Sequence, residues 1–223
     1  MDRFVCVRLV QAWGMDLDIF LSDPALTLAC VFMNADGAVY GRWSSRQARD
    51  LPALTKAVEG ALELHAKWPS NRAELEGKKA PALPWRRTSD VPGLRDKYGA
   101  AGVQGRGCLH CHDVREGVVR SLEKEKRPVP ERFSTPWPKP ERVGMSLAPG
   151  ERASVIEVQK GGAAEKAGVK AGDRIARLGG QPILSIADVE WALYVAADEG
   201  ELAVEIERGA TLKIRLAKGW RNP

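Results

Sequence analysis

The feature that most constrains the fold is a block of small residues between Gly161 and Ile175, which runs Gly-Gly-Ala-Ala-Glu-Lys-Ala-Gly-Val-Lys-Ala-Gly-Asp-Arg-Ile. Gly168 and Gly172 favour turns with positive φ, and Asp173 is placed to hold the turn before the next strand. The block therefore predicts a short helix between two strands. Three alanines are small enough to let that helix pack closely on a sheet: Ala163, Ala164 and Ala167.

The surroundings of this block resemble the PDZ domain of the bacterial high-temperature-requirement proteases. A strand at Ala153–Gln159 precedes the block, an amphipathic helix near Ser185–Ala196 follows it, and two strands end at Trp220. The resemblance covers residues 143–220. It implies a β-sandwich or partial barrel with two helices.

The same resemblance implies that the C-terminus of a partner peptide adds as a strand beside Met145–Leu147. Backbone N–H groups around Val143 and Gly144 would bind the peptide carboxylate. The implied peptide-binding residues are Val143, Gly144, Met145, Ser146, Leu147, Ile186, Glu190 and Leu193. The alternative is a PDZ fold whose groove is covered by a neighbouring part of the chain.

A second motif, Cys108-Leu109-His110-Cys111-His112, has the Cys-x-x-Cys-His pattern that attaches c-type haem. In that chemistry, Cys108 and Cys111 bond to the haem vinyl groups and His112 becomes the proximal iron ligand. His65 is the first candidate for the sixth ligand, with Met145 or Met33 as alternatives.

Three other interpretations of this motif stay open. A tetrahedral zinc site is consistent with Cys108, Cys111, His112 or His110, and His65 as ligands. Adjacent histidines would also suit a redox dithiol. The remaining interpretation is a disulfide or an inert pair. The other two cysteines, Cys6 and Cys30, lie in apolar runs that predict buried thiols.

The N-terminal part of the chain predicts strands and one helix. Arg3–Val10 is β-branched and apolar, as expected of a buried strand, and Ala25–Asn34 predicts a second strand. Asp36-Gly37 predicts a hairpin turn into Ala38–Trp43, and Asp50–Trp68 has helical apolar spacing. This order resembles the second half of a thioredoxin-like domain over residues 3–68. The helix that carries that family's Cys-x-x-Cys pair has no counterpart, so its thiol chemistry is not expected here.

Between these regions the chain is rich in proline, glycine and charge. Residues 127–142 contain five prolines, which favour extended chain over helix. We therefore expect an α+β protein with four consecutive segments. These are a partial thioredoxin-like domain (1–68), a Cys-x-x-Cys-His segment (69–126), a Pro-rich linker (127–142) and a PDZ domain (143–220).

Charge and motifs limit the function classes. The net charge is +5, and residues 67–142 carry 17 Lys and Arg against 10 Asp and Glu, an arrangement that suits an acidic protein partner or a solvated segment. No nucleic-acid motif and no transmembrane stretch is present in the sequence. The chain lacks a Gly-x-Ser-x-Gly element, so we expect no hydrolase.

Taken as a whole, the arrangement resembles multidomain proteins of planctomycete bacteria. The expected function is peptide binding through the PDZ domain, combined with a c-type haem for electron transfer or redox sensing. The alternative is a non-enzymatic adaptor with structural zinc or a disulfide. Haem attachment would imply a periplasmic or cell-envelope location with a leader beyond this chain, and otherwise a cytoplasmic one.

Overall fold

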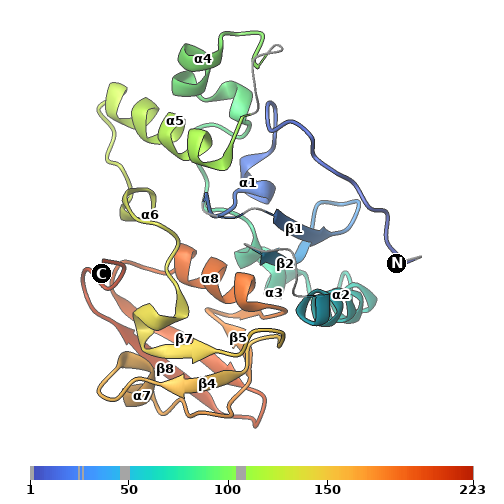
Figure 1. The fold of residues 1–223 in the computed structure, drawn as a ribbon, viewed down its shortest axis with the longest axis vertical. Coiled ribbons are helices and arrows are strands. Elements are labelled where there is room, and N and C mark those ends of the chain that lie inside the picture. Colours follow the sequence, from blue (N-terminus) through green and yellow to red (C-terminus); the bar gives the residue numbers. More distant parts are fainter. Residues whose placement is uncertain (1–2, 25, 27, 46–50, 104–108, 223) are drawn as a thin grey trace. The chain divides into compact units, whose positions relative to one another are not determined.

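The computed structural model describes all residues except 1–2, 25, 27, 46–50, 104–108 and 223 (Figure 1). The chain divides into two compact units. The first unit comprises residues 1–24 and 82–129, and the second comprises residues 25–81 and 130–223. This division differs from the four consecutive segments expected from the sequence, because residues 1–24 group with 82–129 and not with the chain that follows them.

The regular structure described in the first unit is helical. Its α4 and α5 lie side by side and are held at close distance by two glycines (Figure 1). A Cβ atom at Gly93 would lie 2.5 Å from the carbonyl oxygen of Gly117. Ser121 Oγ accepts the N–H of Gly93 at 2.7 Å and donates to the carbonyl of Gly117 at 2.6 Å. The helices are α1 (Leu17–Phe20), η2 (Thr88–Asp90), α4 (Pro92–Tyr98) and α5 (Cys111–Lys124).

The second unit begins with an antiparallel hairpin followed by a helix, as the sequence predicts. Gly37 adopts φ 76° in the turn, and Cys30 pairs with Trp43 across the hairpin. This stretch contains β1 (Leu28–Met33), β2 (Val39–Ser45), α2 (Leu51–Ala66), α3 (Arg72–Leu75) and η1 (Glu76–Lys78).

The rest of the second unit contains two sheets and two main helices. One sheet has two strands, β3 and β4, and the other has four strands in the order β6-β5-β7-β8. The elements are α6 (Glu131–Ser134), η3 (Pro140–Val143), β3 (Met145–Leu147), β4 (Val155–Val158), α7 (Ala163–Ala167), β5 (Ile175–Leu178), β6 (Gln181–Pro182), α8 (Ile186–Val195), β7 (Gly200–Ile206) and β8 (Thr211–Leu216).

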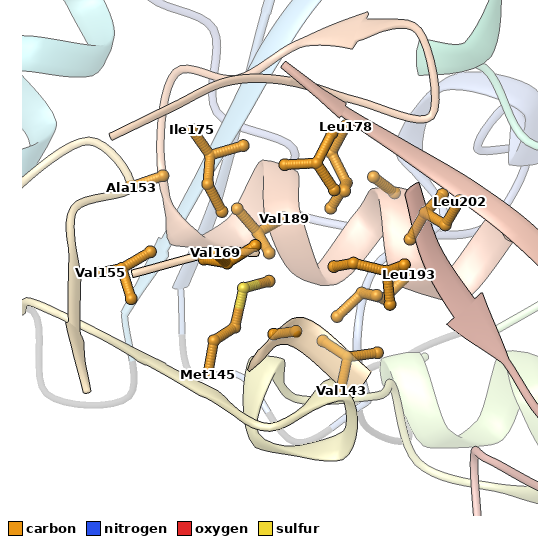
Figure 2. Packing of buried hydrophobic residues seen from close by; sticks show 14 of the residues in the cluster. Val143, Met145, Ala153, Val155, Val169, Ile175, Leu178, Val189, Leu193 and Leu202 are labelled. Carbon is orange, nitrogen blue, oxygen red and sulfur yellow. The ribbon is translucent and has the colours of Figure 1, made fainter. Parts of the chain in front are cut away.

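Apolar side chains from both sheets and from α8 form one core (Figure 2). Met145 from β3 and Leu193 from α8 lie within it, together with Leu178 and Ile175 from β5. All four side chains are at most 1% exposed. Burial of this size is the main stabilising term of the unit, since each fully buried side chain contributes about 1.5–3 kcal/mol.

The structure confirms the predictions made from the small-residue block. Helix α7 covers its alanines, and Ala164 is fully buried. Gly168 and Gly172 have φ of 93° and 89°. The carboxylate of Asp173 accepts the N–H of Lys170 at 2.9 Å and an Arg208 N–H at 2.7 Å, so it holds the turn before β5.

Two predictions for the N-terminus are wrong. Residues 3–10 form no strand, and Val5 is 92% and Val7 79% exposed. Cys6 is exposed as well, and Cys30 is half-buried. A β-branched run becomes a strand only where a neighbouring strand pairs with it, and none does so in the described part of the chain.

The Pro-rich segment is also more structured than the sequence predicts. Residues 131–134 form the short helix α6 despite the neighbouring prolines. Phe133 and Trp137 are buried, and Trp137 stacks on Tyr194 of α8 with ring centroids 4.6 Å apart. This part of the segment packs as core and does not behave as a solvated spacer.

Candidate functional site

The candidate site combines the edge of strand β3 with a cleft whose lining includes Pro149, two residues after the strand. β3 pairs with β4 on one side, through a ladder that includes Ser146 opposite Glu157. Gly144 O accepts from Gln159, and Ala148 N–H donates to Ser154 O, so residues 144, 146 and 148 turn their backbone groups toward β4. Because these groups alternate along an antiparallel strand, those of Met145 and Leu147 turn toward the opposite edge.

The side chains of β3 do not form the floor of an open groove. Those of Val143, Met145 and Leu147 are buried in the core, and only Ser146 among the strand residues is partly exposed. Gly144 adopts a left-handed conformation at the end of η3. Its N–H already donates to the carbonyl of Glu141 at 3.0 Å. What β3 could offer a ligand is its backbone edge, and this edge is largely covered, because Met145 and Leu147 are 1% and 7% exposed as whole residues.

On the helix side, two of the three residues expected to face the groove line the cleft. These are Ile186 and Glu190, which are one helical turn apart on α8. Leu193 is fully buried in the core and does not line the cleft. Serine at the N-cap of the helix, Ser185, accepts the N–H of Asp188.

The cleft has a volume of about 420 Å³ and is built from two parts of the unit. One wall comes from α8 and the turn after β3 and includes Ile186, Ala187 and Pro149. The facing wall comes from the N-terminal hairpin and helix of the unit. Its residues are Leu26, Trp43, Ser44 and Ala53.

Charged side chains at this cleft are held in ion pairs. Lys139 Nζ lies 2.8 Å from Glu190 Oε1, and Lys56 Nζ lies 2.6 Å from Glu151 Oε1. The hydrogen bond from Lys56 lowers the pKa of Glu151, so this carboxylate stays ionised. The cleft therefore presents apolar walls with paired charges at its margin.

A fully buried carboxylate joins the two walls. Asp188 Oδ1 lies 2.8 Å from Lys78 Nζ, and both side chains are 0% exposed. The same carboxylate accepts the N–H of Arg42 and that of Leu184, each at 3.0 Å. In addition, the hydroxyl of Ser185 donates to the carbonyl of Arg42. Strand β2 and η1 are thus tied to the first turn of α8.

Two buried cations share this carboxylate. Burial lowers the pKa of Lys78, and the nearby Asp188 opposes that effect. Burial likewise lowers the pKa of Arg42 to about 10, again opposed by Asp188. The guanidinium of Arg42 lies 3.7 Å from the ring centroid of Trp191, whose face supplies further stabilisation.

The Cys-x-x-Cys-His motif lies at the start of α5 in the first unit. Cys108 falls outside the described residues. Cys111 is half-buried, with its Sγ 3.3 Å from Ser22 Oγ, and the side chain of His112 is 57% exposed. The rings of His110 and His112 stack with centroids 5.3 Å apart.

Asp113 organises this helix start. It is buried, accepts the N–H of His110 and lies 2.5 Å from Lys97 Nζ. Burial raises the pKa of Asp113, but the hydrogen bonds from Lys97 and His110 outweigh it and lower the pKa to about 2. Within the described residues, no group of three or more His, Cys, Asp and Glu is arranged to hold a metal.

The other proposed ligands lie in the second unit. His65 is exposed at the end of α2, and its Nδ1 is 2.7 Å from the hydroxyl of Tyr40. Met145 is 1% exposed in the core formed by the two sheets and α8, where neighbouring apolar side chains enclose its thioether, so it is not placed to bind an iron. Met33, on β1, is half-buried.

Sequence reasoning missed the wall that faces α8. Trp43 and Ala53 lie in elements that were predicted, but the sequence gives no sign that these elements pack on the PDZ helix. Lys139 was assigned to a linker. Pro149 and Glu151 lie two and four residues after the end of β3. Extending the predicted peptide-binding segment by four residues would therefore have included them.

Comparison with known proteins identifies one domain. A family model described as PDZ domain matches residues 121–215. The match starts within α5 and includes all the strands from β3 to β7. No curated protein matches the chain. A PDZ domain supports a peptide-binding or adaptor role, and none of the described helices has the length and hydropathy to span a bilayer.

Proposed function

We propose that this protein is an adaptor that binds the C-terminal end of a partner polypeptide as an added strand on β3. The observation that carries this proposal is the outward-turned backbone of Met145 and Leu147, together with a cleft of about 420 Å³ that is lined by Pro149, two residues after β3, and by Ile186 of α8. An extended peptide satisfies such an edge with its own backbone groups, and its side chains enter the neighbouring cleft.

The peptide carboxylate is assigned to the N–H of Met145. Of the groups expected to bind it, the N–H of Gly144 already donates to Glu141 O. The left-handed conformation of Gly144 turns the chain from η3 into β3, so the next N–H along the chain lies at the start of the groove. This assignment keeps the expected place of the carboxylate but moves its donor by one residue.

Peptides with defined ends test the proposal. Fluorescence anisotropy with a library of C-terminal peptides would first select a ligand, and the selected peptide is then compared with its C-terminal amide. We expect the amide to lose at least about 10-fold in affinity, because a charge-assisted hydrogen bond contributes about 1.5–3 kcal/mol. Equal affinity of acid and amide would contradict carboxylate recognition.

Backbone methylation of the peptide tests strand addition without changing the protein. N-methylation removes one peptide N–H, so methylation at residues that face β3 should weaken binding strongly. Methylation at the alternate residues, whose N–H groups point away, is the matched control and should have little effect. A uniform response along the peptide would contradict strand addition.

As a second function, we propose that the motif at residues 108–112 binds a prosthetic group, with c-type haem first and zinc as the alternative. The supporting observation is that Cys111 and the exposed His112 are consecutive at the start of α5. When bound, haem would supply one-electron redox chemistry. Cys108 and Cys111 would attach it and His112 would ligate the iron, while a zinc ion would use the same thiols with His112 or His110.

Absorption and metal content separate these proposals. Expression together with a cytochrome c maturation system should give a red protein with a Soret band that survives denaturation, because the attachment is covalent. The Cys111→Ser variant should reduce this covalent attachment, and Ser22→Ala, next to it, is the control. A colourless protein with one equivalent of zinc would support the zinc site, and one with neither would remove both proposals.

A further inference from the structure

We infer that β2 and α2 form part of the peptide site and select an apolar side chain two to four residues before the C-terminus of the ligand. This inference rests on the proposed function and names the class of ligand that the groove prefers. The contributing residues, Trp43 on β2 and Ala53 on α2, lie outside the stretch that matches the PDZ family.

The facing wall is a fixed part of the site. β2 is held to α8 by the buried Asp188, which accepts the N–H of Arg42 and pairs with Lys78. The indole N–H of Trp191 donates to the carbonyl of Gly77 at 2.9 Å, which fixes η1 to the same helix. A Cβ atom at Gly41 would lie 2.7 Å from Asp188 Oδ2, so the strand and the helix are in close contact.

The direction of the ligand follows from β3. A strand that adds antiparallel to β3 with its carboxylate at Met145 runs upstream past Leu147 toward Pro149. The residue opposite Leu147, where β3 ends, is then two positions before the ligand's end, and the residues before it lie beside the turn that contains Pro149. Pro149 lines the cleft, and Ile186 lines it from α8, so side chains from that part of the ligand enter between Ile186 and the Trp43 wall.

The chemistry of the cleft favours an apolar occupant. Its apolar lining residues are Leu26, Trp43, Ala53, Pro149, Ile186 and Ala187, and Ser44 and Ser185 line it as well. The anions at its margin, Glu190 and Glu151, are already paired with Lys139 and Lys56. A charged ligand side chain gains no unpaired counter-ion there and loses water, whereas a leucine or phenylalanine side chain buries apolar area.

Filling the cleft from the α2 side tests the inference on the full chain. Ala53→Phe adds a ring at the wall, at a residue that is only 5% exposed, so its free energy of unfolding is measured together with binding; Ala66→Phe, at the exposed end of α2, is the control. We expect Ala53→Phe to weaken a selected carboxylate peptide by about 10- to 100-fold and Ala66→Phe to leave it unchanged. In the wild-type protein, aspartate in place of the apolar side chain should cause a similar loss.

Cross-linking gives a measurement that does not depend on the fold of a variant. A peptide with benzoylphenylalanine two to four residues before its C-terminus should label residues between 39 and 57 of the wild-type chain, as mapped by mass spectrometry. Labelling confined to residues 139–195, with Ala53→Phe binding normally, overturns the inference and leaves the proposed function intact. Absence of binding of any carboxylate peptide to the wild-type chain overturns the proposed function itself.

Discussion

Helix α8 is buried on two faces that are stabilised in different ways. Toward the PDZ core it presents Val189, Ala192 and Leu193, all at most 1% exposed among apolar neighbours. Toward β2 and η1 it presents Asp188 and Trp191, where one carboxylate meets two buried cations. The first face depends on apolar area and the second on the pairing of charge.

This difference shows which face of α8 brings the N-terminal hairpin and helix to the cleft. A PDZ domain needs the apolar face to fold, and the small-residue block of the sequence already implies it. The polar face holds the N-terminal hairpin and helix against α8, and this region supplies four of the eleven residues that line the cleft. Substitutions on the two faces should therefore differ in how much they reduce the free energy of unfolding and in how they affect ligand selection.

The largest effect is expected at the buried carboxylate. Asp188→Ala leaves Lys78 and Arg42 without their counter-ion and removes the acceptor of two backbone N–H groups. Breaking a buried pair by removing one partner costs about 3–5 kcal/mol, and we expect that loss in the free energy of unfolding from urea titration.

Two variants make this result specific. Glu201→Ala, at an exposed carboxylate whose partner Lys213 is also exposed, is the control and should change the free energy of unfolding by less than about 0.5 kcal/mol. Removing the charges of Lys78 and Asp188 together, with Lys78→Met and Asp188→Asn, leaves only Arg42 charged and should recover part of the loss. A stability of Asp188→Ala equal to that of the control would show that the two faces do not differ as described.

A substitution on the apolar face should reduce the free energy of unfolding somewhat less. Leu193→Ala removes a side chain that is 0% exposed, and the lost burial together with the cavity costs about 3 kcal/mol. Differential scanning calorimetry or urea titration measures it. Ile156→Ala, at a side chain that is 56% exposed, should have almost no effect, and equal losses in both variants would contradict the assignment of Leu193 to the core.

A smaller loss of stability is expected from a substitution between α4 and α5 in the first unit. Gly93→Ala places a methyl group 2.5 Å from the carbonyl of Gly117, which must move α4 away from α5. Overpacking costs about 1–3 kcal/mol, partly offset by the better helix propensity of alanine, so we expect a net loss of about 1–2 kcal/mol. Peptide binding by the second unit should be unchanged, and a parallel loss of affinity would show that the units are not independent.

The smallest effect depends on pH. The pKa of Asp113 is about 2 in the folded protein and 3.8 ordinarily, so its ionised form stabilises the fold above about pH 4 and this contribution is lost as the pH falls toward 2. Because Lys97 is partly exposed, the contribution is about 1 kcal/mol. Asp113→Asn should be less stable than wild type at pH 6 and nearly equal at pH 2. Asp96→Asn, at an exposed pair, is the control, and a difference that persists at pH 2 contradicts this cause.

The sequence predicts the elements of the PDZ region because the turns and the close helix packing that require glycine and alanine are set by neighbouring residues. Gly168, Gly172 and Asp173 each act within a few residues, and the structure has them as expected. The hairpin at Gly37 and the helix α2 were predicted for the same reason. In contrast, Arg3–Val10 has the composition of a strand but pairs with none in the described part of the chain.

The contact of β2 and η1 with α8 could not be predicted from the sequence, for a physical reason. Lys78 and Asp188 are 110 positions apart, and a lysine in a charged stretch gives no sign that it will be fully buried. Trp137 lies among prolines, where an extended linker is the natural expectation, yet it stacks on Tyr194. Long-range pairing of isolated charges and aromatics has no periodic pattern, so only the folded structure shows it.

Amide hydrogen exchange at single-residue resolution tests strand addition on β3 most directly. With a saturating C-terminal peptide, the amides of Met145 and Leu147 should become at least about 10-fold better protected, since they gain hydrogen bonds to the ligand. Ser146, which already lies in the ladder with β4, should change much less. Protection that is equal at all three amides, or that is confined to other parts of the chain, would contradict the account.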